Sequence, residues 1–270
     1  MKNLFCVKDK VVIITGATGV LGTAMSEHFG EQGAKVVLLA RKNEAGENLA
    51  EKIRKSGGEA IFLQSYVMDR EILEKNYEQI MEKYGRIDVL INCAGGNMPG
   101  ATIPPDKTIF DLNLDDFRTV VDLNLFGSII PTMVFAKAMT LQKTGSIINI
   151  SSESAIRPLT RVAGYGTAKA AITNFTKYMC GEMALKYGDG IRVNAIAPGF
   201  FLTEQNRTLL TNPDGSYTDR ARLIIEHTPF KRFGAPEELV GTLQWLASDA
   251  SKFVSGTLTV VDGGFDAFCL

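Results

Sequence analysis

A tyrosine and a lysine lie four residues apart in the segment YGTAK, residues 165–169, and a serine precedes them at position 152. Residues spaced by four lie on one face of a helix. Free tyrosine has a pKa of about 10, and a nearby cation lowers that pKa by favouring the phenolate. Tyr165 and Lys169 could therefore exchange a proton with a carbonyl oxygen that Ser152 also contacts. The alternative is a surface pair that contributes a few tenths of a kcal/mol, roughly, to helix stability.

A second chemical feature is the glycine spacing in TGATGVLG, where Gly16, Gly19 and Gly22 lie three residues apart after the apolar segment KVVIIT. Glycines in such a turn permit a tight bend, close approach of a pyrophosphate and close packing of helix on strand. The helix that follows directs its first amides at the phosphates. A glycine triplet alone also fits a structural turn, but its position after the first apolar strand favours a dinucleotide site.

The residues after the next apolar strand bear on the choice of cofactor. Arg41 and Lys42 follow this strand, and no acidic residue falls between Val36 and Asn43. NAD enzymes often carry an Asp or Glu here for the ribose 2′-hydroxyl, whereas a basic residue suits a 2′-phosphate. The pattern favours NADP(H), with NAD(H) possible. The alternative is a solvated basic pair at a helix start.

These groups must be held by an alternation of apolar strands and helices. Short apolar runs predict strands at 10–15, 35–40, 60–67, 87–95, 145–152, 191–198 and 257–264. Helical patterns fall at 25–33, 45–58, 71–85 and 115–139, from near 165, and at 236–249. The alternation predicts an α/β fold: a single-domain, Rossmann-like, doubly wound parallel sheet of about seven strands with helices on both faces, spanning residues 1–270. Such sheets bind ligands beyond the carboxyl ends of their strands.

Composition excludes several other classes of protein. A net charge of -1 does not suggest a nucleic-acid surface or a polybasic membrane patch. The start, MKNLFCVKDK, lacks a signal-peptide core, and we expect no apolar run long enough to span a bilayer. Cys6, Cys93, Cys180 and Cys269 show no metal-binding spacing, and His28 and His227 are far apart. We expect a cytoplasmic protein with reduced thiols and no metal.

Taken in order, the motifs resemble the short-chain dehydrogenase/reductase family over nearly the whole chain. The matching segments are TGATGVLG, NCAGG at 92–96, Asn124 in DLNLFG, INISS, YGTAK, IAPG and the terminal VDGG. The resemblance implies an enzyme that interconverts a ketone and a secondary alcohol. Two features depart from it. The glycine turn reads TGxxGxxG, where this family more often has TGxxxGxG, and Tyr66 stands where many members have an adenine-binding aspartate.

The resemblance also implies roles for individual residues. Tyr165 would be the general acid/base, Lys169 would bind the nicotinamide ribose and favour the phenolate, Ser152 would bind the substrate carbonyl, and Asn124 would hold a water. Ser152 could instead cap its loop, and Asn124 could satisfy buried backbone groups. The cofactor would contact Gly16, Thr18, Gly19, Val20, Leu21, Gly22, Arg41, Lys42, Val67, Asn92, Ala94, Gly95, Tyr165, Lys169, Pro198, Gly199 and Thr203.

The segment 199–234 would be the substrate lid. Its motifs GFFLTEQNRTLL, NPDGS and HTPFKRFG resemble the bacterial D-mannonate oxidoreductase (fructuronate reductase) subgroup, which implies D-fructuronate and D-mannonate as substrates. Candidate substrate residues are Asn97, Ser152, Glu153, Arg157, Gln205, Asn206 and Arg207. An arginine can bind a carboxylate through two hydrogen bonds. The alternatives are 5-keto-gluconate, a 3-oxoacyl thioester, for which Phe200 and Phe201 would suit an apolar pocket, and a non-catalytic cofactor-sensing protein.

The resemblance finally implies a homotetramer or a homodimer. The interfaces would use the helices around 115–140 and 164–187 and the C-terminal strand and helix. The apolar tail FDAFCL, residues 265–270, would otherwise be an exposed patch.

Overall fold

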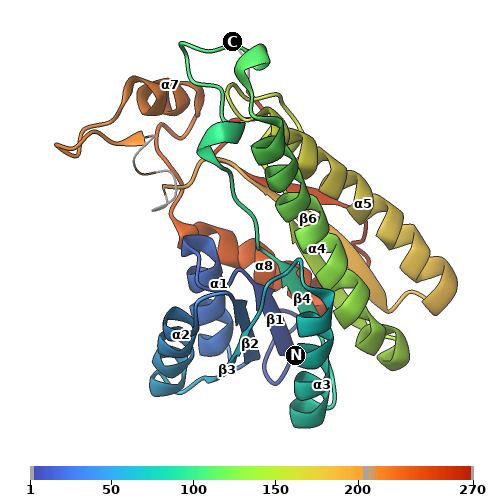
Figure 1. Cartoon of the computed structure of the whole chain (residues 1–270). Coiled ribbons are helices and arrows are strands. Elements are labelled where there is room, and N and C mark those ends of the chain that lie inside the picture. The colour runs from blue at the N-terminus through green and yellow to red at the C-terminus, as the bar shows by residue number, and fades with distance from the viewer. Residues whose placement is uncertain (1–2, 203–206, 208–209, 269–270) are drawn as a thin grey trace.

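A single parallel sheet of seven strands forms the centre of the computed structural model, which describes residues 3–202, 207 and 210–268 (Figure 1). The strands are β1 Val11–Thr15, β2 Lys35–Ala40, β3 Glu59–Gln64, β4 Val89–Asn92, β5 Gly145–Ile150, β6 Ile191–Pro198 and β7 Leu258–Val261. Every neighbouring pair is parallel, and the order across the sheet is β3-β2-β1-β4-β5-β6-β7. The predicted Rossmann-like fold is confirmed.

Helices connect the strands and cover both faces of the sheet. They are α1 Val20–Glu31, α2 Asn43–Lys55, α3 Arg70–Tyr84, α4 Leu114–Gln142, α5 Ala163–Tyr187, α7 Asp219–His227 and α8 Val240–Ala247, with 3-10 turns η1 Pro99–Ala101, η2 Ile109–Asp111, η3 Glu153–Ala155, η4 Pro236–Leu239 and η5 Asp249–Ser251. Capping fixes several ends. The Asp69 carboxylate accepts a hydrogen bond from the Ile72 amide, and Gly85 ends the same helix at a positive φ of 69°.

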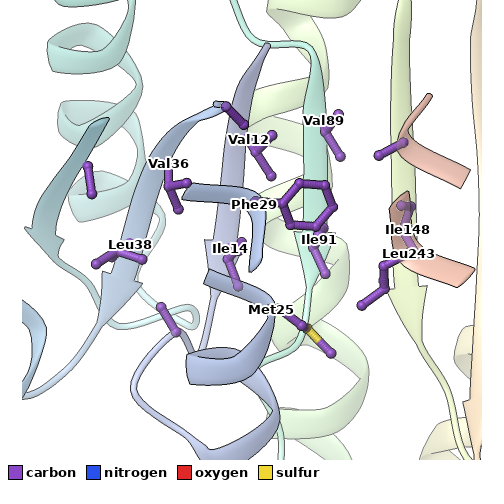
Figure 2. Close-up of a cluster of buried hydrophobic side chains, with 14 of the residues drawn as sticks. Val12, Ile14, Met25, Phe29, Val36, Leu38, Val89, Ile91, Ile148 and Leu243 are labelled. Atoms are coloured by element: carbon purple, nitrogen blue, oxygen red, sulfur yellow. The ribbon is translucent and has the colours of Figure 1, made fainter. Parts of the chain in front are cut away.

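Alternate strand residues supply two hydrophobic cores, because successive side chains of a strand point to opposite faces. Val12 and Ile14 pack on one face with Met25 and Phe29 of α1, as Figure 2 shows, and α2 and α8 complete that core. Their neighbours Val11 and Ile13 belong to the second core, with side chains of α3, α4 and α5. Both cores form because the strands are apolar on both faces, as expected for a covered parallel sheet.

Helices α4 and α5 lie side by side on one face (Figure 1). Helix α4 has 29 residues, and by length and composition alone its most apolar stretch could cross a membrane. The expectation that no apolar run reaches this length was therefore wrong. Half of this apolar stretch is buried inside the protein, which is typical of a core helix.

The segment expected to form a lid has structure of its own. Within its described part, α7 begins at a Thr218 cap, and a short bridge joins Phe201 to Gly234. Leu210, Ala221, Ile224 and Phe233 form a separate small hydrophobic cluster with the partly buried Phe200, Leu202 and Ile225. No helix was predicted from the sequence in this segment, because a nine-residue helix with a small core carries little periodicity.

Candidate functional site

The strand order reverses between the adjacent strands β1 and β4, because β2 and β3 extend the sheet on one side and β5 to β7 on the other. A cavity of about 660 Å³ lies beyond the carboxyl ends of the strands. Crevices at such reversals are where open α/β sheets bind ligands. Of the residues predicted to contact a cofactor, the cavity is lined by Gly16, Thr18, Gly19, Val20, Leu21, Gly22, Arg41, Lys42, Val67, Ala94, Gly95, Tyr165, Pro198 and Gly199. Residues predicted from segments far apart in the chain thus line a single cavity.

The glycine turn between β1 and α1 is shaped by steric need. Gly16 has a φ of 66°, and a Cβ added to it would lie 2.9 Å from Ala94 Cα. A Cβ on Gly22 would lie only 2.3 Å from the Gly16 carbonyl oxygen. Helix α1 begins immediately after Gly19, so its first amides face the cavity. The turn is therefore suited to an anionic ligand despite its unusual glycine spacing.

Two cations line the far end of the same cavity. Arg41 and Lys42 are both exposed there, and no Asp or Glu belongs to the lining among the residues that the structure describes. The Arg41 carbonyl accepts a hydrogen bond from Gln64 Nε2 at 3.0 Å, which ties the end of β2 to β3. This end of the cavity therefore favours a negatively charged group.

Ser152 and Tyr165 line the opposite end. Ser152 lies two residues beyond β5, and Tyr165 occupies the first turn of α5. The Ser152 hydroxyl accepts a hydrogen bond from the Ser154 amide at 3.2 Å, and its side chain also hydrogen-bonds Tyr165. The loop-capping role considered for Ser152 is thus present, together with the contact to the tyrosine.

A ladder of buried polar contacts fixes α5 against β5. Asn149 Nδ2 donates to Thr176 Oγ1 at 2.9 Å, and Ser151 and Thr173 share a hydroxyl contact at 2.7 Å. Lys169 Nζ donates to the Ile150 carbonyl at 2.8 Å. Buried groups paired in this way make the relative position of helix and strand well defined. Ser152 and Tyr165 are consequently presented together.

The electrostatics of Tyr165 and Lys169 differ from the sequence expectation. Burial raises the pKa of Tyr165 above its usual value, and the hydrogen bond with Ser152 opposes this shift only in part. Burial also lowers the pKa of Lys169 to about 8. The ammonium lies over the tyrosine ring, 5.5 Å from its centroid. The expected lowering of the tyrosine pKa was wrong, because burial dominates the shift and Lys169 is not among the groups that lower this pKa.

Asn124 is fully buried and is occupied by backbone groups. Its Oδ1 accepts from the Gly96 amide at 3.1 Å, and its Nδ2 donates to the carbonyls of Gly96 and Val120 at 2.6 and 2.8 Å. A Cβ on Gly95 would meet the same Oδ1 at 2.6 Å. Asn124 therefore joins α4 to the loop after β4, which is the structural role considered above. Asn92 lies behind the cavity, where its Nδ2 contacts Thr132 and Asn149.

Four of the predicted substrate residues do not line the cavity. Asn97 Nδ2 donates to Thr102 Oγ1 at 3.1 Å, and Arg157 Nε donates to Asp266 Oδ1 at 2.7 Å. Glu153 is buried, and Arg207 is exposed. None of these four lines the cavity, whereas Ser152 does. Gln205, Asn206 and the predicted cofactor contact Thr203 lie outside the described residues.

Several contributors were missed. The Thr15 hydroxyl accepts from the amides of Cys93 and Ala94 at 3.1 and 3.0 Å, and so fixes the loop after β4 to the end of β1. In the sequence, only the position of Thr15 directly before Gly16 could have indicated this role. The cavity is also lined by Tyr66, Phe200 and Phe201, which were singled out in the sequence, and by residues that were not: Leu39, Ala40, Ala45, Ser65, Cys93, Leu123, Ile150 and Ser151. Most of these are apolar or small, so their chemistry does not distinguish them from core residues.

Comparison with known proteins agrees with this geometry. The family described as short chain dehydrogenase matches residues 10–214. The uncharacterized oxidoreductase UxuB of Bacillus subtilis (strain 168) is 44% identical over 268 residues, covering 96% of this chain and 95% of the relative. The chain therefore belongs to the short-chain dehydrogenase/reductase family and is an oxidoreductase.

Two solved structures resemble the protein over its whole length. One is a Haemophilus influenza protein whose assignment as a D-mannonate oxidoreductase is provisional, solved with NAD (40% identity, TM-score 0.91, 99% of each chain). The other is a gluconate 5-dehydrogenase from Burkholderia cenocepacia J2315 in complex with NADP and tartrate (30% identity, TM-score 0.87, 98% of each chain). Relatives thus bind either nicotinamide cofactor.

Proposed function

We propose that this oxidoreductase interconverts the ketone and the secondary alcohol of a sugar acid, D-fructuronate and D-mannonate. The observation that carries the proposal is the joint presentation of Ser152 and Tyr165 at one end of a cavity whose other end is a glycine turn. The sugar-acid class is supported by two relatives, one provisionally assigned to D-mannonate and one named for gluconate.

A nicotinamide cofactor fits the cavity from end to end. Glycines line the turn where a Cβ would meet backbone, the first amides of α1 suit a pyrophosphate, and Tyr165 lies at the opposite end. Arg41 and Lys42, with no described carboxylate beside them in the lining, favour NADP(H). NAD(H) is the alternative, since a relative holds it.

In this reaction, the bound cofactor supplies or accepts a hydride. Tyr165 donates a proton to the carbonyl oxygen during reduction and takes it back during oxidation. Burial raises the pKa of Tyr165, so the phenol carries its proton at neutral pH, and the neighbouring Lys169 cation would have to offset this shift for the proton to be released. The Ser152 hydroxyl, already in contact with the Tyr165 side chain, holds the same oxygen and stabilises its developing charge.

Lys169 and Asn124 support this pair. Lys169 lies over the Tyr165 ring, where its cationic form stabilises negative charge that develops on the phenol. We further propose that Lys169 contacts the cofactor ribose when the cofactor is bound. Asn124 fixes the backbone at Gly96, next to the cavity residue Gly95.

The sugar-acid assignment is tested by kinetics with a substrate panel. D-fructuronate should have a higher kcat/KM than a 3-oxoacyl thioester or a neutral ketose, because recognition of a carboxylate and several hydroxyls leaves polar groups unpaired with other substrates. 5-Keto-gluconate is the second candidate, favoured by the gluconate relative. A higher kcat/KM for the thioester would overturn the sugar-acid assignment and leave the oxidoreductase class intact.

We also propose that the protein forms a homotetramer, or else a homodimer, through α4 and α5. Large apolar side chains are exposed along both helices, including Met133 and Leu141 on α4 and Tyr178 and Leu185 on α5. Burying such surface against another copy is favourable. Light scattering at micromolar concentration should show an oligomer, and a monomer there would contradict the proposal.

A further inference from the structure

Glu153 directly follows Ser152 and is 1% exposed. Neither of its carboxylate oxygens has a hydrogen-bond partner within the described residues. A buried ion without a partner is strongly destabilising, whereas a neutral carboxylic acid is tolerated far better. The site of this side chain therefore disfavours its charged form.

The charges around Glu153 point the same way. Asp262 and Asp266, from the segment after β7, raise the pKa of Glu153, while Arg157 lowers it. Arg157 already pairs with Asp266, with Nε and Oδ1 2.7 Å apart. Helix α5, which packs on the turn that carries Glu153, places Tyr165 and Lys169 at its near end. Among the described residues, Arg157 is thus the one cation that lowers the pKa of Glu153, against two carboxyl groups that raise it, and it is already paired with Asp266.

The segment 262–266 supports the wall of the cavity. The Asp262 carboxylate accepts from the amides of Gly264 and Asp266 at 2.8 and 2.6 Å, which folds the segment into a tight turn. A Cβ on the cavity residue Gly199 would lie 2.6 Å from Asp262 Cβ, so the two backbones are in close contact. Phe265 packs edge-on against the cavity residue Phe200, with ring centroids 5.1 Å apart.

We propose that Glu153 is a positioning residue that must be uncharged to keep the 262–266 segment seated against the serine loop and the cavity wall. Loss of its proton places a third negative charge against Asp262 and Asp266 in a buried space. The segment then loosens, and with it Gly199, Phe200 and the cluster that contains Phe200. Glu153 thereby sets an upper pH limit on a well-formed cavity.

The sign of the effect follows from linkage. Burial, Asp262 and Asp266 raise the pKa of Glu153 to about 7, above its unfolded value. The folded state then binds more protons than the unfolded state between these two pKa values. Stability therefore falls as pH rises through this window, and the loss is complete above about pH 7.

The test compares Glu153→Gln, a neutral carboxyl analogue, with the unmodified protein. Melting temperatures of the full-length protein are measured from pH about 5 to about 8, spanning the window above. The Tm difference between the variant and the unmodified protein should grow with pH to several degrees, roughly. Glu82→Gln, on the exposed face of α3, is the matched control and should show no such growth. Glu153→Met, similar in size and uncharged, serves if the glutamine variant does not fold.

A kinetic arm rests on the proposed function and uses D-fructuronate as the substrate. In the unmodified protein, KM should rise roughly several-fold from the lowest to the highest pH of the same range. The rise should be absent in Glu153→Gln, with little change in how kcat depends on pH. Equal pH dependence of Tm in both proteins would overturn the positioning role. Absence of turnover with an intact Tm result would count against the proposed substrate alone.

Discussion

The two sides of the cavity are built by different means. On the glycine-turn side, the backbone of residues 16–22 and 93–95 forms the wall, and Thr15 holds the two loops together by backbone amides. On the side of Ser152 and Tyr165, pairs of side chains from distant segments support the wall. One such pair is Arg157 and Asp266, which are 109 residues apart in the sequence. A wall made of backbone depends on a few steric requirements. A wall made of side-chain pairs depends on many residues at once, so the two sides should respond differently to substitution.

The largest effect on turnover is expected from substitution of Tyr165. Tyr165→Phe removes the proton while keeping the ring, and kcat should fall by about 10²–10⁴-fold, the usual contribution of a general acid. Cofactor binding, measured by fluorescence titration, should change little because the backbone wall is intact. Near-normal turnover would break the assignment of Tyr165.

Lys169→Met should make the protein more stable at neutral pH and less active. The pKa of Lys169 is lowered to about 8 by burial, so below that pH the folded state carries the cost of a buried ammonium. At about 1.4 kcal/mol per pKa unit, the gain on removal is about 3 kcal/mol, and the lost hydrogen bond to Ile150 offsets about 1 kcal/mol of it.

Denaturant unfolding as a function of pH tests this expectation. The advantage of Lys169→Met should be present at neutral pH and should vanish as pH rises from about 8 toward about 10.5, where the unfolded lysine also loses its proton. Turnover should drop in the same variant. A variant less stable than the unmodified protein at neutral pH would show that the ammonium is better paired than its burial implies.

Arg41→Ala tests cofactor choice at the end of the backbone wall. A charged contact with a 2′-phosphate contributes about 1.5–3 kcal/mol, so the Kd for NADPH should rise about 10- to 150-fold. The Kd for NADH is the internal control and should change little. Equal loss for both cofactors, or an unmodified protein that prefers NADH, would reverse the proposed preference.

The smallest effect compares two helical glycines. Gly22→Ala places a Cβ against the Gly16 carbonyl and should destabilise the protein by about 1–3 kcal/mol with weakened cofactor binding. Gly181→Ala on α5 meets nothing within 4 Å and should stabilise by about 0.5–1 kcal/mol. Thermal unfolding with and without cofactor measures both. Similar behaviour of the two variants would show that the turn tolerates a side chain.

The same contrast explains what could be predicted from sequence. Each strand is a short apolar run and each connection carries a helical pattern, so all seven strands and the sheet type were predictable. The strand at 60–67 was drawn three residues too long, because Ser65, Tyr66 and Val67 continue its β-forming composition after the chain has turned into the cavity. The glycine turn was predictable because its steric requirements leave few residue types.

The side-chain network was not predictable. Nothing near Glu153 in sequence indicates that Asp262 and Asp266 will face it, since their approach depends on where β7 joins the sheet. The direction of the Tyr165 pKa shift was also wrong, because spacing reveals a neighbouring lysine and conceals how much solvent is lost. Arg157 was expected to bind substrate, yet its partner Asp266 comes from beyond the last strand.

The placement of Arg41 and Lys42 has an evolutionary consequence. Both side chains are exposed at the end of β2, whereas the serine and tyrosine are fixed to β5 and α5 by a separate set of contacts. Selection can therefore exchange the residues proposed to choose between NADP(H) and NAD(H) without altering the residues proposed to handle the proton. A lineage of such enzymes can switch between biosynthetic and degradative electron carriers by few substitutions at one surface turn.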